Sequence, residues 1–276
     1  MVEKMSASGR KDSSGAARVS GNATSSGASS TRSAHLRIWR GGPDGGFLTR
    51  YEVPITEGMV VLDAIHWIQA NVDSSLAVRW NCKAAHCGSC TAEVNGRPAL
   101  TCKSRLDSFG DEEIEVRPMK TFPVIKDLVC DVSFNYRCAE KIPPFAPRTG
   151  APRPFIMLQE DVERAQEFKK CIECFICQDV CHVLRDHKAP YYGPRYMVKI
   201  AQYEMHPMDG LTRTKHLKDE AGIGYCNITK CCEELCPEHI TITDNAIIPL
   251  KERVVDDFYD PLTVIRRKLS KDPERV

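Results

Sequence analysis

The stretch Cys171 to Cys181, CIECFICQDVC, decides the fold of the second half of this chain. Its cysteines have the spacing C-x2-C-x2-C-x3-C, in which the first three hold one iron–sulfur cluster and the fourth ligates another. A second run must supply the missing ligands. The stretch Cys226 to Pro237, CNITKCCEELCP, provides it.

The register of the two runs predicts which cysteines share a cluster. A [4Fe–4S] cluster is expected on Cys171, Cys174, Cys177 and Cys236. The other cluster is expected on Cys181, Cys226 and Cys232. A complete second run would need a cysteine at position 229, which is Thr229. We therefore expect a three-iron [3Fe–4S] cluster. The alternative is a four-iron cluster completed by Cys231, but this residue is out of register by two and would point to a different face of a helical turn.

A third cysteine motif lies upstream. The stretch Cys82 to Cys90, CKAAHCGSC, is followed by Cys102, which gives the spacing C-x4-C-x2-C-x11-C. This matches the plant-type [2Fe–2S] pattern, in which a loop wraps the cluster and a distant cysteine completes it. Gly88 and Ser89 are small and let backbone N–H groups approach sulfur. A zinc site is the alternative, but zinc sites usually pair two C-x2-C knuckles.

Composition narrows the function further. The chain has 276 residues, fourteen cysteines and a net charge of +1, which gives no reason to expect a nucleic-acid partner. It has no apolar run long enough to span a bilayer and no secretory signal, so a reducing compartment is expected. No Walker A, G-x-S-x-G or H-E-x-x-H motif is present, and no catalytic residue is predicted. Three cysteines without partners at ligand spacing are interpreted as packing residues: Cys130, Cys138 and Cys231.

The order of patterns predicts an α+β chain. Residues 1–33, rich in Ser and Gly, are expected to be disordered. Residues 34–120 should form a [2Fe–2S] domain, 121–158 a proline-rich connector, and 159–276 an α-helical domain with the other two clusters. The expected strands and turns are 36–53 around a Gly41–Gly46 turn, 91–102 around Asn95-Gly96, and 114–116. The expected helices are 60–71, 159–170, 194–203 and 261–269.

A plant-type motif followed by a bacterial-type pair is unusual in one chain. It resembles the iron–sulfur subunit of the succinate dehydrogenase and fumarate reductase family. Besides the three cysteine motifs, Asn95 to Cys102 (NGRPALTC) and Arg117 to Asp131 (RPMKTFPVIKDLVCD) carry the resemblance. The latter stretch contains no predicted cluster ligand, so its match supports the resemblance independently of the cysteine motifs.

The resemblance implies a fold, a function and partners. The first domain would be a β-grasp ferredoxin domain docked on a flavoprotein subunit that carries FAD, and the second would be bacterial-ferredoxin-like. Electrons would pass from flavin through the [2Fe–2S], [4Fe–4S] and [3Fe–4S] clusters to quinone at a membrane-anchor subunit, or in reverse. The chain would be peripheral, held at the cytoplasmic face of the membrane, and part of the tricarboxylic acid cycle and respiratory chain.

The sequence departs from the family near the expected quinone. His182 replaces a proline common in relatives, Asn227 replaces a frequent histidine, and a tryptophan is missing near Arg185. In the relatives these positions approach the quinone, so the resemblance implies that His182, Arg185 and Asn227 are quinone-proximal. The departures imply that the quinone site is rearranged or that the exit acceptor differs. The patch formed with Asp186 and His187 would carry protons or contact the anchor, or else be a solvated helix face.

Two other functions stay open. The chain could serve a related dehydrogenase or a thiol-linked reductase, which the co-purifying flavoprotein would reveal. It could also be a zinc-stabilised scaffold, which would be colourless. Because the subunit is expected to dock on partners, we predict exposed apolar surface and poor solubility when it is expressed alone.

Overall fold

The computed structural model describes residues 32–151, 153–263 and 265. The predicted disordered tail falls almost wholly on residues 1–31, which lie outside the described residues. Most of the predicted helix 261–269 lies outside them as well. Within the described part of the chain, no helix is both long enough and apolar enough to cross a membrane.

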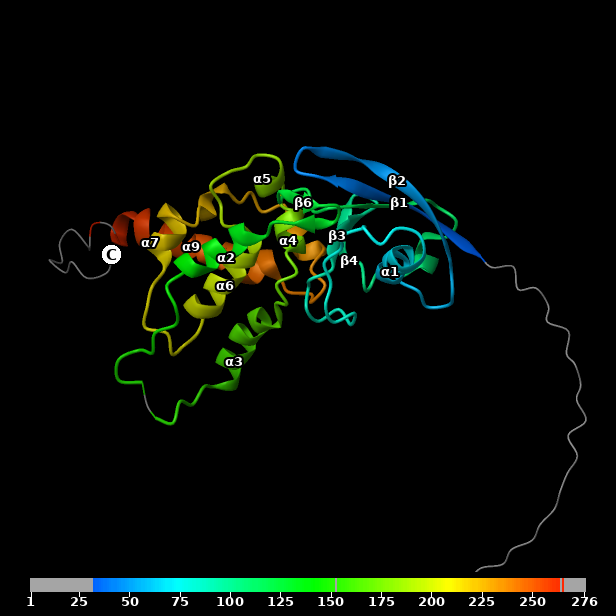
Figure 1. Cartoon of the computed structure of the whole chain (residues 1–276). Coiled ribbons are helices and arrows are strands. Elements are labelled where there is room, and N and C mark those ends of the chain that lie inside the picture. The colour runs from blue at the N-terminus through cyan, green and yellow to red at the C-terminus, as the bar shows by residue number, and fades with distance from the viewer. Residues whose placement is uncertain (1–31, 152, 264, 266–276) are drawn as a thin grey trace, which may run out of the picture. The chain divides into compact units, whose positions relative to one another are not determined.

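The first part of the chain is a five-stranded mixed sheet (Figure 1). The strand order is β2-β1-β5-β3-β4, with β1 and β5 parallel and the other neighbours antiparallel. The strands are β1 (Ser33–Gly42), β2 (Gly45–Pro54), β3 (Thr91–Val94), β4 (Arg97–Leu100) and β5 (Ile114–Arg117). These strands confirm the predicted hairpins and the predicted short strand.

Helix α1 (Val61–Asn71) packs its apolar residues into the core of the sheet. Val61, Ile65 and Ile68 recur at helical spacing and are fully buried against strand residues such as Leu36 and Val116. The predicted helix is thus confirmed. Asn95 and Gly96 both have positive φ, as the tight turn predicted between β3 and β4 requires.

The predicted connector, residues 121–158, contains more structure than its prolines suggested. It forms a two-stranded sheet of β6 (Val124–Lys126) and β7 (Val129–Cys130), followed by α2 (Ser133–Lys141). Asp127, in the turn, is buried, and its carboxylate accepts hydrogen bonds from the Gly41 and Ala77 backbone and from Arg40. These long-range bonds fix the connector to the first sheet, and no local sequence pattern reveals them.

The rest of the described chain consists of short helices around α6 (Pro194–Glu204). Met197, Ile200 and Ala201 of α6 are fully buried. The predicted helix 159–170 is α3 (Gln159–Gln166) followed by a 3-10 turn, η2 (Glu167–Lys170). The other elements are α4 (Ile176–Asp179), α5 (His182–Arg185), α7 (Thr214–Asp219), η3 (Ile223–Tyr225), α8 (Cys231–Glu234), the π-helix η4 (Ile242–Ile247) and α9 (Ile248–Phe258).

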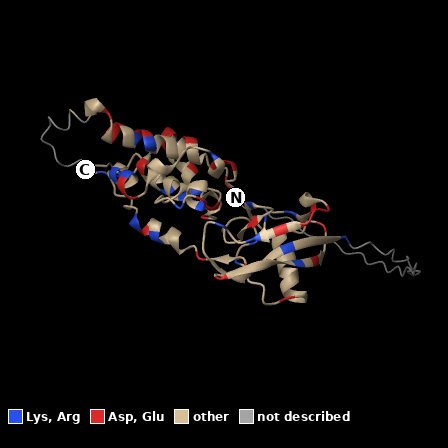
Figure 2. Cartoon of the chain, turned by 90° about the horizontal axis from the view of Figure 1, so that it is seen from above, with Lys and Arg blue, Asp and Glu red and all other residues tan. Residues whose placement is uncertain are grey.

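The sheet and the helices share a small hydrophobic core. Leu62 and Leu100 from the sheet side pack with Ile176 of α4. Three predicted ligands, Cys90, Cys102 and Cys174, belong to the same group of buried residues. Acidic and basic side chains are interspersed over both parts (Figure 2), in keeping with the net charge of +1. The apolar contact therefore holds two of the cysteine motifs side by side.

Candidate iron–sulfur centres

The loop from Cys82 to Cys90 lies between α1 and β3 and has no regular secondary structure. The backbone N–H groups of Ala84 and His86 donate to Cys82 Sγ at 3.3 and 3.4 Å. The Cys82 N–H donates to Cys87 Sγ at 3.5 Å. The loop thus points its N–H groups at sulfur, which is the arrangement that stabilises thiolates and sulfides.

Left-handed backbone conformations produce this loop. Positive φ values occur at Lys83, Ala85 and Gly88. Burial alone would raise the pKa of the Cys87 thiol, but hydrogen bonds from Ser89 and Cys82 outweigh it and lower the pKa to about 6. Cys87 is therefore ready to bind iron as a thiolate.

Cys102 reaches the loop from the end of β4. Thr101 donates to the Cys90 carbonyl through both its backbone N–H, at 3.3 Å, and its hydroxyl, at 2.9 Å. Burial, together with the nearby Cys90 and Cys82 sulfurs, raises the pKa of Cys102 to about 11. The four cysteines of the first motif are thus brought together, as the spacing predicted.

The four predicted ligands of the second cluster line a single cavity. Its wall includes Cys171, Cys174, Cys177 and Cys236, with Arg195 and apolar side chains between them. Cys177 is buried, and burial, with further contributions from neighbouring cysteine sulfurs, raises its pKa well above the ordinary value. Iron must therefore displace these protons on binding. An enclosed cavity with four thiols and an apolar wall fits a [4Fe–4S] cluster.

The third group gathers beside Tyr191, whose hydroxyl pKa is raised by burial and by the nearby sulfurs of Cys226, Cys181 and Cys232. Burial raises the pKa of Cys181 to about 11, and the sulfurs of Cys231 and Cys226 add to the shift. Burial likewise raises the pKa of Cys232 to about 12, although Thr243 opposes it. The structure thus unites the three predicted ligands and adds Cys231 to them. No set of three or more His, Cys, Asp or Glu in the described chain could hold one metal ion, but cluster ligands bind different irons and stand farther apart.

Backbone conformation shows how the two runs correspond. Positive φ values occur at Glu173 and Phe175 in the first run and at Ile228 and Lys230 in the second. Phe175 caps α4 and Lys230 caps α8 in the same way, each with its carbonyl accepting the first helical hydrogen bonds. Thr229 therefore occupies the position equivalent to Cys174. Cys231 corresponds to Ile176, which is not a predicted ligand.

The three cysteines without a predicted cluster have different surroundings. Cys130 and Cys138 are buried in hydrophobic clusters, which confirms that they are packing residues. Cys231 is only half-buried, with its Sγ 3.4 Å from the Thr229 hydroxyl and 3.7 Å from the Val180 carbonyl. The packing interpretation was wrong for Cys231, because the run it belongs to turns it toward the third group.

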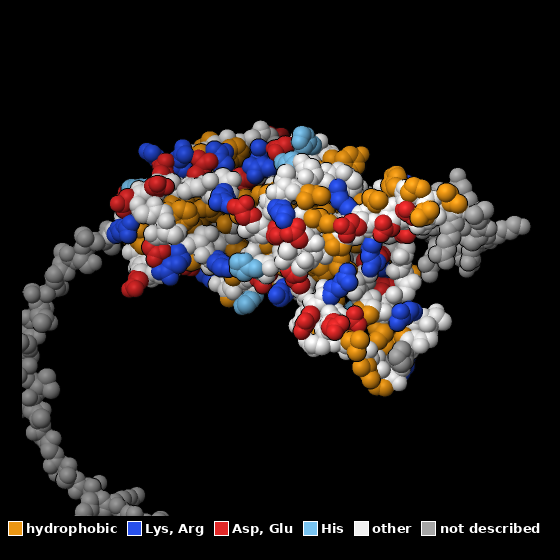
Figure 3. All heavy atoms as spheres, turned by 180° about the vertical axis from the view of Figure 1, so that it is seen from behind, with side chains coloured by type: hydrophobic (Ala, Val, Ile, Leu, Met, Phe, Trp, Pro, Cys, Tyr) orange, Lys and Arg blue, Asp and Glu red, His pale blue; other side chains and the backbone are white. Residues whose placement is uncertain are grey.

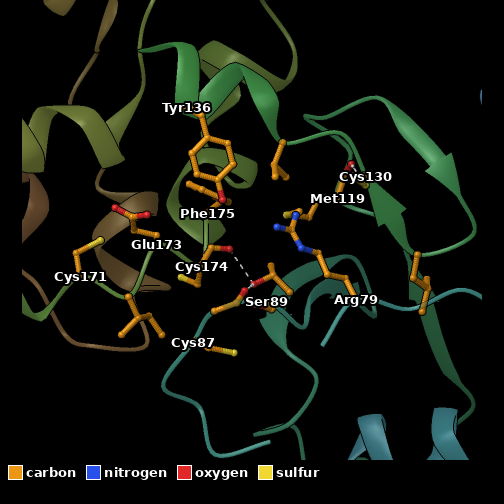
Figure 4. Close-up of a pocket in the computed structure, with 15 residues that line it drawn as sticks. Arg79, Cys87, Ser89, Met119, Cys130, Tyr136, Cys171, Glu173, Cys174 and Phe175 are labelled. Atoms are coloured by element: carbon orange, nitrogen blue, oxygen red, sulfur yellow. Dashed lines mark hydrogen bonds between the residues drawn. The ribbon is translucent and has the colours of Figure 1, made fainter. Parts of the chain in front are cut away.

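The loops of the first and second groups are in direct contact. The Thr91 hydroxyl lies 3.0 Å from the Gly88 carbonyl and 2.8 Å from the Cys174 carbonyl. A Cβ on Gly88 would lie only 2.5 Å from the Cys174 Cα. Beside this contact is a cavity of about 300 Å³, shown in Figure 4, into which Arg79 extends from the sheet side and Tyr136 from α2. The backbones of the two groups thus pack directly against each other at Gly88 and Cys174.

The predicted quinone-proximal residues do not form one set. Asn227 Nδ2 lies 2.7 Å from His182 Nε2, so these two side chains meet. Arg185 instead pairs with Glu93 on β3 at 3.0 Å, and Asp186 pairs with Lys120 at 3.7 Å. The expectation that Arg185 shares an exposed patch with His182 was wrong, because its guanidinium forms an ion pair with the buried carboxylate of Glu93 in the first domain.

Glu93 and Asp179 form a buried acidic pair that the sequence did not reveal. Both carboxyl groups are almost inaccessible to solvent. Burial and the neighbouring Asp179 raise the pKa of Glu93 to about 7, although Arg185 opposes the shift. Burial also raises the pKa of Asp179. Because Glu93 lies between Cys90 and Cys102 and Asp179 lies between Cys177 and Cys181, the pair sits where the motifs meet.

Comparisons with known proteins agree with this geometry. Residues 35–137 match the family model of a 2Fe-2S iron-sulfur cluster binding domain, and residues 167–240 match that of a 4Fe-4S dicluster domain. The fold and the site therefore define an iron–sulfur electron-transfer protein with one [2Fe–2S] domain and one two-cluster domain.

Similarity to whole chains is more specific. The chain is 30% identical to the fumarate reductase iron–sulfur subunit of Haemophilus influenzae over 209 residues, which cover 70% of this chain and 81% of that one. It is 28% identical over 207 residues to the succinate dehydrogenase iron–sulfur subunit of Bacillus subtilis, covering 70% and 81%. A chain in the Mycobacterium smegmatis Sdh1 complex in the apo form matches with a TM-score of 0.81 and 56% identity, over 84% of this chain and all of that one.

The chain belongs to the succinate dehydrogenase and fumarate reductase iron–sulfur subunit family. It is accordingly an electron-transfer subunit of an oxidoreductase, and the predicted resemblance is confirmed.

Proposed function

We propose that this chain relays electrons between FAD in a flavoprotein subunit and quinone at a membrane-anchor subunit. The first cluster would be held by Cys82, Cys87, Cys90 and Cys102. The second would be a [4Fe–4S] cluster on Cys171, Cys174, Cys177 and Cys236. The third would be a [3Fe–4S] cluster on Cys181, Cys226 and Cys232. The strand order β2-β1-β5-β3-β4 with α1 packed on it supports a β-grasp fold for the first domain.

The observation that carries the proposal is the linear arrangement of the three cysteine groups. Gly88 of the first group touches Cys174 of the second. The second and third groups are joined by α4, which carries Cys177 and ends shortly before Cys181. An electron that moves through these contacts from the first group to the third must therefore pass the second group.

Exposed apolar side chains support docking on partners. Phe155, Ile156 and Leu158, on the segment that leads to α3, are all more than half exposed. Hydrophobic side chains gather on the protruding lobe at the lower right of Figure 3. Tyr225 and Ile228, beside Cys226 of the third group, are also exposed. Large apolar side chains in such positions are usually covered in an assembly. We place the anchor and the quinone at the second of these surfaces, and the chain at the cytoplasmic face of the membrane.

The test is an EPR spectrum and an iron count on the native complex. We expect a signal from the oxidised three-iron cluster, a [2Fe–2S] signal after reduction, and about nine irons per chain. About ten irons without an oxidised signal would mean that the third cluster has four irons. Bound zinc without iron would refute electron transfer. Co-purification of a flavoprotein that acts on thiols would favour the thiol-linked reductase.

A further inference from the structure

Arg195, the second residue of α6, has a buried nitrogen without a partner. Its side chain is 6% exposed and lies in the wall of the cavity formed by Cys171, Cys174, Cys177 and Cys236. Its Nη2 pairs with Glu173, but its Nε is buried and makes no hydrogen bond within the protein. Buried donors in native proteins almost always have an acceptor. The acceptor for this Nε is therefore expected in the cavity itself.

The charge of Arg195 also faces the cavity. Burial alone would lower the pKa of its guanidinium, but the Cys171 and Cys177 sulfurs and the Glu173 carboxylate outweigh it and raise the pKa. The side chain thus remains a cation beside two of the proposed ligands. Since Glu173 is 54% exposed, water screens its negative charge more than the buried positive charge of Arg195.

The backbone holds Arg195 in this place. Gln178 Oε1 accepts a hydrogen bond from the Arg195 N–H at 3.2 Å, and Gln178 directly follows Cys177 in α4. Gln178 Nε2 donates to the Tyr192 carbonyl at 2.9 Å and is completely buried. The start of α6 is thus tied to the helix that carries a proposed ligand, which fixes the backbone position from which the Arg195 side chain reaches the cavity wall.

We propose that Arg195 tunes the second cluster, donating a hydrogen bond from Nε to a cluster sulfur and raising the reduction potential of that cluster alone. The inference rests on the proposed assignment of Cys171, Cys174, Cys177 and Cys236. Hydrogen bonds to sulfur and nearby positive charge stabilise the reduced form, which carries one more negative charge. The other two clusters should respond little, because the cysteines that share the cavity wall with Arg195 all belong to the second group.

The test is an EPR-monitored redox titration of the intact complex. Arg195→Met should shift the midpoint of the [4Fe–4S] cluster to a more negative potential and leave the other two midpoints in place. Arg195→Lys keeps the charge without Nε and should give a smaller negative shift. Glu173→Gln removes the opposing charge and should shift the midpoint in the positive direction.

Lys199→Met is the matched control. Lys199 lies on the same helix, and its Nζ contacts Gln202 rather than the cavity. It should change no midpoint, so a shift equal to that of Arg195→Met would show a general charge effect and overturn the proposal. An unchanged [4Fe–4S] midpoint in both Arg195 variants, with all irons present, would also overturn it.

Two further outcomes distinguish a failure of the proposed role of Arg195 from a failure of the cluster assignment on which it rests. Loss of only the [4Fe–4S] cluster from both Arg195 variants would show that the residue retains the cluster instead of tuning it, and would contradict the proposal. A wild-type complex without a [4Fe–4S] signal would instead refute the ligand assignment.

Discussion

Replacement of Gly88 by alanine should separate the first two cysteine groups. Gly88 has φ +67°, and a Cβ there would lie 2.5 Å from the Cys174 Cα and 2.7 Å from its backbone nitrogen. Carbon atoms pack at about 3.5–4.0 Å, so the two loops would have to part by roughly 1 Å. Neither obstructing atom belongs to a flexible side chain, so the backbone itself must move.

The cost has two parts that a second variant can separate. A non-glycine residue in the left-handed region costs roughly 1–2 kcal/mol, and forcing atoms into a packed site costs roughly 1–3 kcal/mol more. Gly96, in the turn between β3 and β4, has φ +77° with nothing within 4 Å of an added Cβ, so Gly96→Ala carries only the first cost. The difference between the two variants therefore measures the clash with Cys174.

The assay is thermal unfolding of the assembled complex at one scan rate. Gly88→Ala should unfold below Gly96→Ala by roughly 2–12 °C, from about 1–3 kcal/mol and about 2–4 °C per kcal/mol. Reduction of the second cluster by the first should also slow, because electron transfer weakens with distance. Equal midpoints for the two variants would refute the packing argument, and an unchanged transfer rate would show that this contact does not set the cluster separation.

Three further variants test the third cluster and the buried acids. Thr229→Cys should convert the third cluster to a four-iron form, giving about ten irons and no oxidised EPR signal; retention of the signal would contradict the register. Cys231→Ser should leave about nine irons, whereas iron loss would identify Cys231 as a ligand. Glu93→Gln should reduce the decline of stability with rising pH. The pKa of Glu93 is about 4.5 in the unfolded chain and about 7 in the folded one. Its contribution to the free energy of unfolding is therefore complete below pH 4.5 and is lost as the pH rises through 7. The loss amounts to about 3 kcal/mol. Thermal midpoints at pH 5 and pH 8 should show it, and an equal decline in the variant would refute the shift.

Spacing predicted the cysteine groups because cluster ligation is mostly a local matter. Three ligands of each complete run lie within a single loop, so their separation along the chain fixes their separation in space. The two-residue turn at Asn95-Gly96 and the periodic apolar face of α1 are local in the same sense. Each could be predicted without knowing how the rest of the chain folds.

The missed features depend on contacts between distant segments. The polar sequence around Arg185 predicts an exposed patch, but its partner Glu93 lies on β3. The prolines of the connector predict little regular structure, yet Asp127 ties it to Arg40 and Ala77. Helical register predicts that Cys231 points away from the third group. In the structure its sulfur nevertheless lies close enough to Cys181 to help raise the pKa of that thiol.

The difference between local motifs and long-range contacts also separates two properties of the clusters, which are the order in which they pass electrons and their reduction potentials. The proposed order of the clusters rests on the loops, since Gly88 meets Cys174 and α4 leads from Cys177 towards Cys181. The reduction potentials depend also on groups outside the cysteine motifs, because hydrogen bonds and nearby charge set the potential of a cluster. Arg195 lies on α6, beyond any spacing rule. Two chains with identical cysteine patterns can therefore carry electrons along the same path at different potentials, and the residues that distinguish them must be sought on the helices that line each cavity.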